Sequence, residues 1–308
     1  MKHNTPTKKR RSVRANDKVA LALGLTVLVS LAATACAGEH HYSFETVVVP
    51  DDNFTQLLGI NNRDRIVGYH NATNFQGFSL ILPAQFTPEN FPGSAQTQVV
   101  GINQRGYTAG FYIDNGGNNH GFLSFNQNFR AVDFPGTTFN QLLGVNDYLQ
   151  AAGYYADTNG NDHPYVYDAY SGVFLTLTIP GAVSAQATGI NHKETVCGFY
   201  IDNAGSNHGF VLTARGTLQT LDFPQSTFTQ ALGVNGRGIV VGTYLDTAGK
   251  SHGFVYDDGR FTSVDDPQGI GTTVVNGIND RGQLVGFYVD SAMNTDGFVA
   301  KPGGEDHD

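Results

Sequence analysis

Tryptophan is absent from the 308 residues, and cysteine and methionine occur only twice each. Charged residues make up 15 % of the chain, too few for the charged faces of coiled coils and most helical bundles. Hydrophobic residues make up 40 %, which supports a packed core and argues against a disordered chain. The abundance of Gly, Tyr, Phe, Val and Thr suggests many short strands joined by tight turns.

The segment 1–36 has the organisation of a secretory signal, with a basic start, an apolar run over 19–35 and small residues at its end. Ala33 and Ala35 fit the cleavage site of a simple signal peptide. Cys36 follows directly and fits the lipobox of a bacterial lipoprotein, although Ala33 stands where that pattern usually has Leu or Val. The sequence predicts an exported protein and leaves three forms open: lipid-anchored at Cys36 in the cell envelope, secreted, or held by an uncleaved anchor.

Without residues 1–36 the chain keeps 11 Lys and Arg against 26 Asp and Glu, a net charge of −15. Such a surface repels phosphate backbones and anionic lipid headgroups. We therefore expect no nucleic-acid partner, and membrane contact only through an N-terminal lipid. The second cysteine, Cys197, stands where a related segment has Val241, which predicts a buried, inert thiol.

The tripeptide Gly-Ile-Asn or Gly-Val-Asn recurs at intervals of 42 to 45 residues. Its glycines are Gly59, Gly101, Gly144, Gly189, Gly233 and Gly277. Each repeat reads as four short β-rich runs, named strands a to d here, separated by turns rich in Gly and Asn. Residues beyond 36 show no helical period. Four strands in a repeat of this length are typical of a propeller blade, so the sequence predicts an all-β, six-bladed β-propeller of four-stranded blades.

The two ends of the repeat region complement each other. Residues 44–50 match strand d of other repeats, such as 129–135, while the last repeat ends near residue 300 with strands a, b and c only. The first strand can therefore complete the last blade and close the ring, which removes the exposed sheet edges of an open array. We expect a linker over 37–43, the propeller over 44–300 and a loose polar tail over 301–308.

The pattern Gly-Ile-Asn-x-x-Gly-x-x-x-Gly is followed in several repeats by His-Gly-Phe, at His120, His208 and His252. It resembles the HAF family of bacterial extracellular repeats, and the resemblance spans most of 44–300. This chain has Gly where the family name has Ala, and it lacks the family's Trp. The resemblance implies an exported bacterial β-repeat protein and transfers no catalytic residue.

Residues present in every repeat are expected to hold the fold. The glycine of each tripeptide permits close backbone approach where blades converge, and the asparagine can cap the turn between strands a and b. In four repeats an aspartate at the end of strand b faces a histidine at the start of strand c, which predicts a hydrogen bond across the loop. The pairs are Asp114 and His120, Asp157 and His163, Asp202 and His208, and Asp246 and His252. We expect no cofactor, with calcium in the oxygen-rich loop 157–162 as the alternative.

Three sets of residues, at the inner rim or on the face that carries the loops between strands d and a, are candidate ligand contacts. Glutamines three residues before the tripeptide glycine can form a ring of amides at the tunnel mouth, or bond to the loops between strands d and a. They include Gln56, Gln98, Gln141, Gln186 and Gln230. Phe54, Phe139 and Phe228, in alternating repeats, can form an apolar platform or pack between loops. Thr188 and Asn276 break a position that is Leu or Val in the other repeats.

The common catalytic motifs are missing: Gly-x-Ser-x-Gly, His-Glu-x-x-His, Cys-x-x-Cys and the phosphate loop. We therefore predict a non-catalytic, monomeric binding or surface-structure module whose partner is a protein or a glycan. The absence of tryptophan weakens the case for a dedicated sugar platform. A hydrolase or lyase with its site at the axial pocket is the alternative. Carboxylates or histidines clustered at the tunnel mouth would favour the enzyme, and a tunnel lined by Gln, Gly and aliphatic residues would favour binding.

Overall fold

The computed structural model describes residues 42–82, 85–269 and 271–303. The predicted export signal with Cys36 and most of the predicted tail lie outside these ranges. The described residues form strands and turns, and they include no apolar helix of membrane-spanning length. The all-β prediction is confirmed.

Each sequence repeat folds into antiparallel strands that pair in chain order. The strands of the first three repeats are β2 (Thr55–Ile60), β3 (Arg65–His70), β4 (Gln76–Ile81), β5 (Gln85–Pro88), β6 (Gln96–Ile102), β7 (Thr108–Ile113), β8 (Asn119–Phe125), β9 (Asn128–Val132), β10 (Asn140–Val145), β11 (Gln150–Ala156), β12 (Asp162–Asp168) and β13 (Val173–Thr176). Those of the last three are β14 (Ala182–Ile190), β15 (Val196–Asp202), β16 (Asn207–Leu212), β17 (Leu218–Leu221), β18 (Phe228–Val234), β19 (Val240–Leu245), β20 (Ser251–Asp257), β21 (Arg260–Val264), β22 (Val274–Ile278), β23 (Leu284–Val289) and β24 (Thr295–Pro302).

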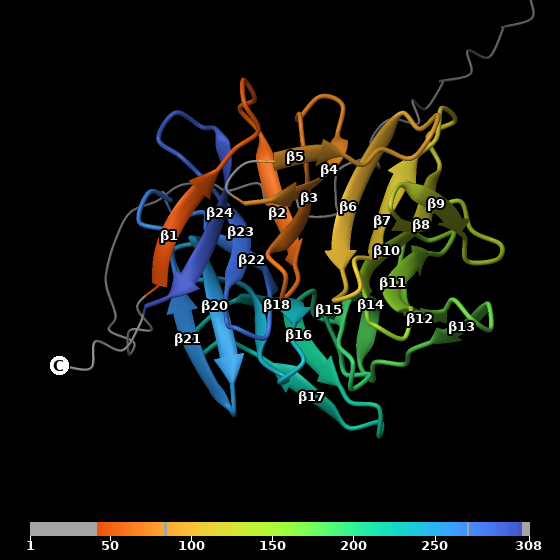
Figure 1. The fold of residues 1–308 in the computed structure, drawn as a ribbon. Coiled ribbons are helices and arrows are strands. Elements are labelled where there is room, and N and C mark those ends of the chain that lie inside the picture. The colour runs from red at the N-terminus through yellow and green to blue at the C-terminus, as the bar shows by residue number, and fades with distance from the viewer. Residues whose placement is uncertain (1–41, 83–84, 270, 304–308) are drawn as a thin grey trace, which may run out of the picture.

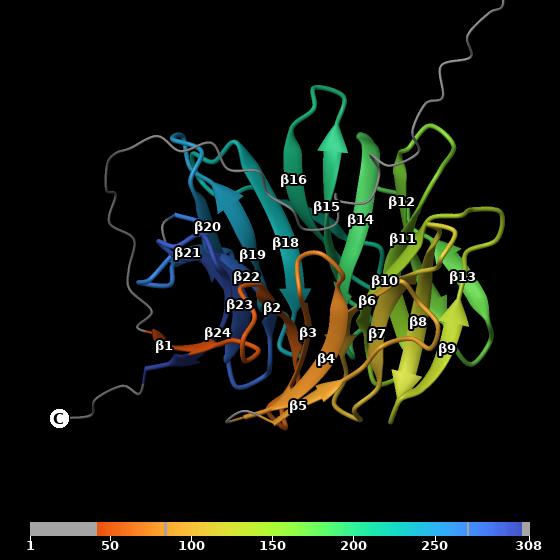
Figure 2. The same cartoon turned by 90° about the horizontal axis from the view of Figure 1, so that it is seen from above.

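The sheets are arranged as the blades of a β-propeller. In Figures 1 and 2 the first strand of each repeat lies toward the middle of the molecule and the fourth strand lies at its periphery. All residues of the inner strand β2 are buried, whereas the outer strand β9 exposes most of its residues. The apolar clusters lie between neighbouring sheets, so each cluster draws side chains from two repeats.

The first strand of the chain pairs with the last one. β1 (Tyr42–Val47) runs antiparallel to β24, with Phe44 opposite Ala300, and completes the sheet β1-β24-β23-β22. Figure 1 shows these two strands side by side at the left of the molecule. β1 begins two residues before the expected propeller boundary at residue 44, and β24 runs two residues past the expected boundary at residue 300.

The fourth and fifth repeats share one eight-stranded sheet. The link is a single parallel pair between Asn207, at the start of β16, and Phe228, at the start of β18. Isolated parallel bridges join other neighbouring repeats in the same way, at Phe54–Thr295, Asn119–Phe139 and Ser251–Thr272. The eight-stranded sheet therefore consists of two four-stranded antiparallel sheets, joined by the kind of parallel bridge that also links other neighbouring repeats.

Every inner strand contains a β-bulge directly before the tripeptide glycine. A bulge adds one residue to the strand and redirects its side chain. The glycine is required because a Cβ on Gly59 would lie 2.7 Å from the Val100 carbonyl oxygen, and one on Gly277 would lie 2.7 Å from that of Leu58. The prediction that these glycines allow close approach of neighbouring repeats is confirmed at five of the six positions; at Gly189 the nearest atom of the next repeat, the Val234 nitrogen, would lie 3.5 Å from a Cβ.

Deletion of residues 43–50 is expected to destabilise the whole protein, because it removes β1 and leaves β24 as an open edge. Val47 also packs with Leu57 and Val285, so the deletion opens the apolar cluster between the first and last repeats. We expect broad, non-cooperative thermal unfolding by circular dichroism, or aggregation by light scattering. A chain starting at residue 37 keeps β1 and is the control. An unchanged melting temperature in the deletion would contradict the role assigned to β1.

Candidate functional site

The axis of the propeller is lined by side chains from every repeat. The bulged residues of the inner strands form one layer: Leu58, Val100, Leu143, Thr188, Leu232 and Asn276. The residues two positions later form a second, aliphatic layer: Ile60, Ile102, Val145, Ile190, Val234 and Ile278. Thr188 and Asn276, which depart from the repeat in sequence, therefore place the only polar side chains into the first layer.

Both polar residues of this layer also tie neighbouring repeats together. Thr188 Oγ1 donates a hydrogen bond to the Ala231 carbonyl oxygen at 2.9 Å, and Asn276 Nδ2 donates to that of Leu57 at 3.0 Å. Asn276 is 6 % exposed, and its Oδ1 accepts no hydrogen bond from the described residues. The axial layer thus holds one buried acceptor that lacks a partner within the described fold.

A cavity of about 200 Å³, called the axial cavity below, opens beside this layer, among the last three repeats and the start of β12. Its polar walls are Asp162, Ser184, Gln186, Asn207, Gln230 and Thr243, and its apolar walls are Ala185, Phe199, Ile201, Phe228, Leu232, Val274 and Phe287. A smaller space of about 80 Å³ around Thr188 and Asn276 shares Gln186, Phe199, Gln230 and Leu232 with it. Asp162, Ser184 and Phe228 are half-buried, so the cavity opens on the face that carries the loops between strands b and c.

Asp162 provides the carboxylate of this cavity. Its Oδ2 accepts a hydrogen bond from Gln186 Nε2 at 2.7 Å, and its backbone N–H donates to Ser184 Oγ at 3.0 Å. Burial raises the pKa of the Asp162 carboxyl above its usual value, against the opposing effect of the Gln186 bond. The corresponding residues of the second and fourth repeats are Asn119 and Asn207, so a carboxylate here is specific to the third repeat.

The glutamines of the predicted ring form hydrogen bonds with different partners in different repeats. Tyr69 donates to Gln56 Oε1 at 2.7 Å, and Tyr154 donates to Gln141 Oε1 at 2.8 Å. Gln230 Nε2 donates to Asn207 at 3.3 Å, and Gln230 is the one of these three glutamines that lines the cavity. The observed partners lie on strands b and c rather than on the loops between strands d and a.

The three candidate phenylalanines are half-buried and lie at the contacts between repeats. Phe54 packs against Tyr69 and Phe75, with ring centroids 5.7 and 5.9 Å apart, and Phe139 packs against Tyr154 at 5.9 Å. Phe228 instead forms part of the cavity wall. Phe54 and Phe139 therefore share a contact with the equivalent strand-b tyrosine, whereas Phe228 does not, and a shared platform stays a prediction.

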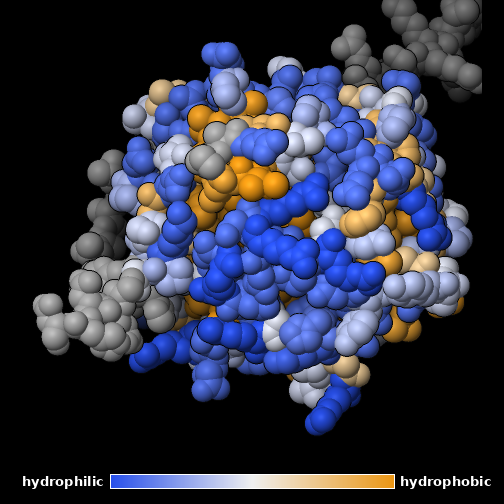
Figure 3. Space-filling model, in the orientation of Figure 1, coloured by the Kyte–Doolittle hydropathy of each residue, from blue (hydrophilic) through white to orange (hydrophobic). Residues whose placement is uncertain are grey.

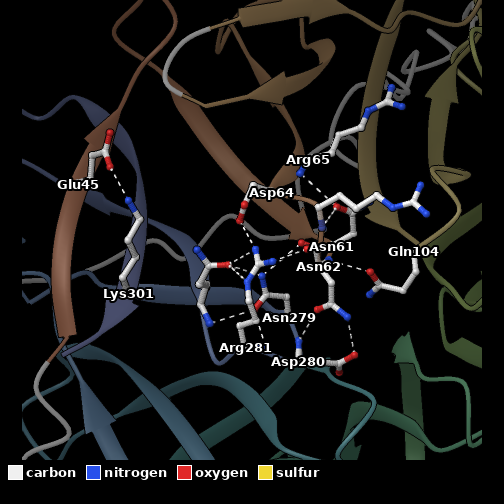
Figure 4. Close-up of polar contacts among 12 residues, drawn as sticks. Glu45, Asn61, Asn62, Asp64, Arg65, Gln104, Asn279, Asp280, Arg281 and Lys301 are labelled. Carbon is white, nitrogen blue, oxygen red and sulfur yellow. Dashed lines mark hydrogen bonds and ion pairs between the residues drawn. The ribbon is translucent and has the colours of Figure 1, made fainter. Parts of the chain in front are cut away.

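The other end of the axis carries a continuous series of asparagine hydrogen bonds. The Nδ2 group of each tripeptide asparagine donates to the backbone carbonyl of the next repeat's asparagine, at 2.9 to 3.3 Å. The series runs through Asn61, Asn103, Asn146, Asn191, Asn235 and Asn279. Asn279 then donates to the Asn61 carbonyl at 3.3 Å, a contact that Figure 4 displays.

The same asparagines cap their own turns. Asn61 Oδ1, for example, accepts hydrogen bonds from the backbone N–H groups of Arg63 and Arg65 at 2.9 and 3.1 Å. The predicted turn cap is therefore confirmed, while the bond between repeats is a second role that the sequence does not reveal. Arg281 adds to this contact by donating to the Asn62 carbonyl and by pairing with Asp64 (Figure 4).

Two carboxylates and a histidine line this second mouth: Asp147, Asp280 and His192. Asp280 Oδ1 accepts from the backbone N–H of Gly236 at 2.7 Å, and Asp147 Oδ1 accepts from that of Gln104 at 2.9 Å. Each carboxylate is thus bound to the turn of a neighbouring repeat. Figure 3 shows a continuous hydrophilic area over the middle of the face where the turns after β2 and β6 gather in Figure 1.

The predicted aspartate–histidine pairs form in all four repeats. The distances from His Nε2 to Asp Oδ2 are 3.3 Å at His120, 3.1 Å at His163, 3.5 Å at His208 and 3.4 Å at His252. Three of these histidines also contact a second aspartate through Nδ1, a contact that we did not predict. These second partners are Asp133 at 2.9 Å, Asp222 at 2.8 Å and Asp265 at 3.0 Å.

The loop 157–162 uses its first aspartate internally. Asp157 Oδ1 accepts from the backbone N–H groups of Asn159 and Asn161, at 2.8 and 3.0 Å. The hydrogen bond from His163, aided by these amides, lowers the pKa of Asp157 to about 2. Within the described ranges, no group of three His, Cys, Asp or Glu side chains is placed to hold a metal ion.

Cys197 is fully buried, as the sequence predicts. Burial raises the pKa of its thiol to about 12, so the thiol is protonated at neutral pH. Cys36, the predicted lipidation site, lies outside the described residues.

No protein-family model and no curated protein matches the sequence. Solved structures share the fold at low identity. A putative TolB from Agrobacterium tumefaciens is 11 % identical with a TM-score of 0.58, over 85 % of this chain and 98 % of that one. TolB from Acinetobacter baumannii is 12 % identical with a TM-score of 0.51 over 79 % of this chain, which spans 65 % of that one.

A fungal lectin from Aleuria aurantia, described as a six-bladed β-propeller with a novel mode of fucose recognition, is also similar. It is 9 % identical with a TM-score of 0.50, over 80 % of this chain and 93 % of the lectin. At these identities the likeness concerns the fold alone, and it agrees with the β-propeller arrangement of the sheets.

The doubly paired histidines predict a pH dependence of stability. Burial lowers the pKa of His208 and of His252, but the hydrogen bonds and charges of their two aspartates outweigh it and raise each pKa above 6.5. The folded state therefore binds these protons more tightly than the unfolded state does. This stabilisation is fully present below pH 6.5 and is lost as the pH rises through the folded-state pKa values.

We expect the melting temperature to fall as the pH rises from about 5.5 to 8.5. The double variant His208→Asn, His252→Asn should have a shallower slope over the same interval. His192→Asn, which changes an exposed histidine on the opposite face, is the control. An identical slope in the double variant and the natural protein would show that these pairs do not couple protonation to folding.

Proposed function

We propose that the protein is an exported six-bladed β-propeller of the HAF-like repeat type, which binds a ligand at its axial cavity without catalysis. The partner class is a glycan or a protein, and the protein acts as a monomer without a cofactor.

Several contacts support six blades in a closed ring. The sequence contains the tripeptide repeat six times. The asparagine bonds link each repeat to the next and return from Asn279 to Asn61. Asn276 of the last repeat also donates to the Leu57 carbonyl of the first, and β1 pairs with β24. Ring closure protects the edges that an open arrangement would expose.

The observation that carries the binding function is the asymmetry of the axial lining. A repeat that served the fold alone would place the same residue type at every equivalent axial position. Here the layer of Leu and Val is broken by Thr188 and Asn276, and the large cavity opens beside them. A concave, partly apolar site with a few convergent polar groups is the usual form of a small-ligand pocket.

The alternative, a hydrolase or lyase, has less support. A general acid and base require carboxylates or histidines that are free to exchange protons with a substrate. Asp147, Asp280 and His192 do gather at the second mouth, which is the feature that would favour an enzyme. Both carboxylates, however, already accept hydrogen bonds from backbone amides, and Asp162 at the cavity accepts one from Gln186. The axial layers are mostly aliphatic, with glycines and glutamines, which favours binding over catalysis.

Filling the axial layer tests the binding site. The double variant Thr188→Leu, Asn276→Leu restores the residue type of the other repeats and reduces the space beside the cavity. We expect it to fold and to lose binding to ligands that the natural protein recognises on glycan and peptide arrays. Thr176→Leu, on the exposed outer strand β13, is the control. Full retention of every array signal by the double variant would contradict an axial site.

Export and anchoring form a separate part of the proposal. If Cys36 is acylated, the protein expressed in a bacterium should partition with membranes, and Cys36→Ser should release it or block processing. Cys197→Val removes the other thiol and should leave partitioning unchanged. Mass spectrometry of the mature N-terminus checks the modification, and an unmodified Cys36 or a start at Ala37 would leave simple secretion.

A further inference from the structure

The hydrogen bonds in the walls of the axial cavity reveal the kind of ligand group that it can accept. The side-chain amides of Gln186, Gln230 and Asn276 each donate a hydrogen bond within the protein, to Asp162, Asn207 and the Leu57 carbonyl. Thr188 likewise donates to the Ala231 carbonyl. Each amide thus uses one of its two N–H groups within the protein, and the Thr188 hydroxyl uses its single donor.

The acceptors around the cavity are free by comparison. Within the described residues, Gln186 and Gln230 form their hydrogen bonds in these walls through Nε2, which leaves Oε1 of each as an acceptor for a ligand. The Asp162 carboxylate accepts from Gln186 and lies beside the Ser184 hydroxyl, and it retains further acceptor capacity. Asn276 Oδ1 in the adjoining space is buried and also without a partner. A ligand group with several donors uses these acceptors most fully: an ammonium offers three, a hydroxyl offers one and a carboxylate offers none.

The charge of the cavity points to the same kind of group. No Lys or Arg lines the cavity, so the Asp162 carboxylate has no basic partner there. The titratable groups near it are His163 and Asp157 on the same hairpin and the buried Tyr154, and the His163 ring is bound to Asp157. Burial without a compensating charge is costly for a carboxylate, and a bound cation would relieve that cost.

The surrounding face is strongly acidic. Lys250 is the one Lys or Arg within the described loops between strands b and c and between strands d and a. Apart from the buried Glu89 and Asp266, the acids on or beside these loops are Asp51, Asp52, Asp114, Asp133, Asp157, Asp162, Asp202, Asp222, Asp246, Asp265, Asp290 and Asp296. A face of one sign around a concave site raises the local concentration of oppositely charged ligands.

Resting on the binding function proposed above, we infer that the axial cavity binds a cationic amine, such as the side chain of a lysine or one end of an aliphatic diamine. The ammonium group donates to Asp162 and to the oxygens of Gln186 and Gln230. The methylene chain packs against Phe199, Phe228 and Phe287, whose rings also attract a cation through their faces.

The experiment measures binding of 1,5-diaminopentane by isothermal titration calorimetry, with 1,5-pentanediol as the neutral analogue of the same length. Asp162→Asn removes the charge and keeps the fold, because Gln141 and Gln230 already donate to Asn119 and Asn207 in the same pairing. Asp51→Asn is the control, since it removes one charge from an exposed loop of the same face.

We expect saturable diamine binding, a loss of affinity of about tenfold or more in Asp162→Asn, little change in Asp51→Asn, and no binding of the diol. Equal losses in the two variants would overturn the inference, because only the charge of the face would then matter. Diol binding equal to that of the diamine would overturn it as well. If the diamine fails to bind while an array ligand is lost in Thr188→Leu, Asn276→Leu, the amine inference fails and the proposed binding function stands. If both fail, the proposed function fails too.

Discussion

The side-chain amide of one asparagine per repeat is the constraint on which the rest of the structure depends. Its oxygen fixes the turn between strands a and b, and its nitrogen binds the carbonyl of the next repeat. Because buried amides require partners for both groups, a change in one turn also affects the neighbouring one. The bulge and the glycine that precede each asparagine bring the inner strands close enough for this bond to form, with Gly277 of the last repeat against the Leu58 carbonyl of the first.

The sequence was most informative where a residue repeats. The period and the matching ends predicted the four-stranded sheets and the pairing of β1 with β24, and the aspartate–histidine loops formed as expected. The asparagine hydrogen bond between repeats was not predicted, because its acceptor is a backbone carbonyl and the sequence pattern gives no information about that acceptor. The second aspartates of His120, His208 and His252 were missed because they end strand d, and the sequence does not show how far strand d reaches along strand c.

The candidate site was harder to predict, because a cavity depends on differences between repeats. Thr188 and Asn276 were visible as departures from the pattern, and both reach the axis. Gln56 and Gln141 hold the same repeat position as Gln230, but each accepts a hydrogen bond from a tyrosine of its own repeat, Tyr69 or Tyr154. The fifth repeat has Thr243 at the position of these tyrosines. Asp162 precedes a repeated histidine, and nothing in the sequence indicates that it lines a cavity. The structure shows this by placing its carboxylate within hydrogen-bonding distance of Gln186. The proposed function therefore depends on small exceptions within a scaffold that the repeats hold rigid.

The central claim is that the repeats form a ring closed by asparagine bonds, and hydrogen exchange followed by mass spectrometry tests it most directly. Asn61→Ala removes the turn cap of the first repeat and its bond to Asn103. In a closed ring, exchange should accelerate both in 103–107 of the second repeat and in 279–283 of the last, while 191–195 across the ring stays protected. Acceleration in 103–107 with unchanged exchange in 279–283 would contradict the closed ring.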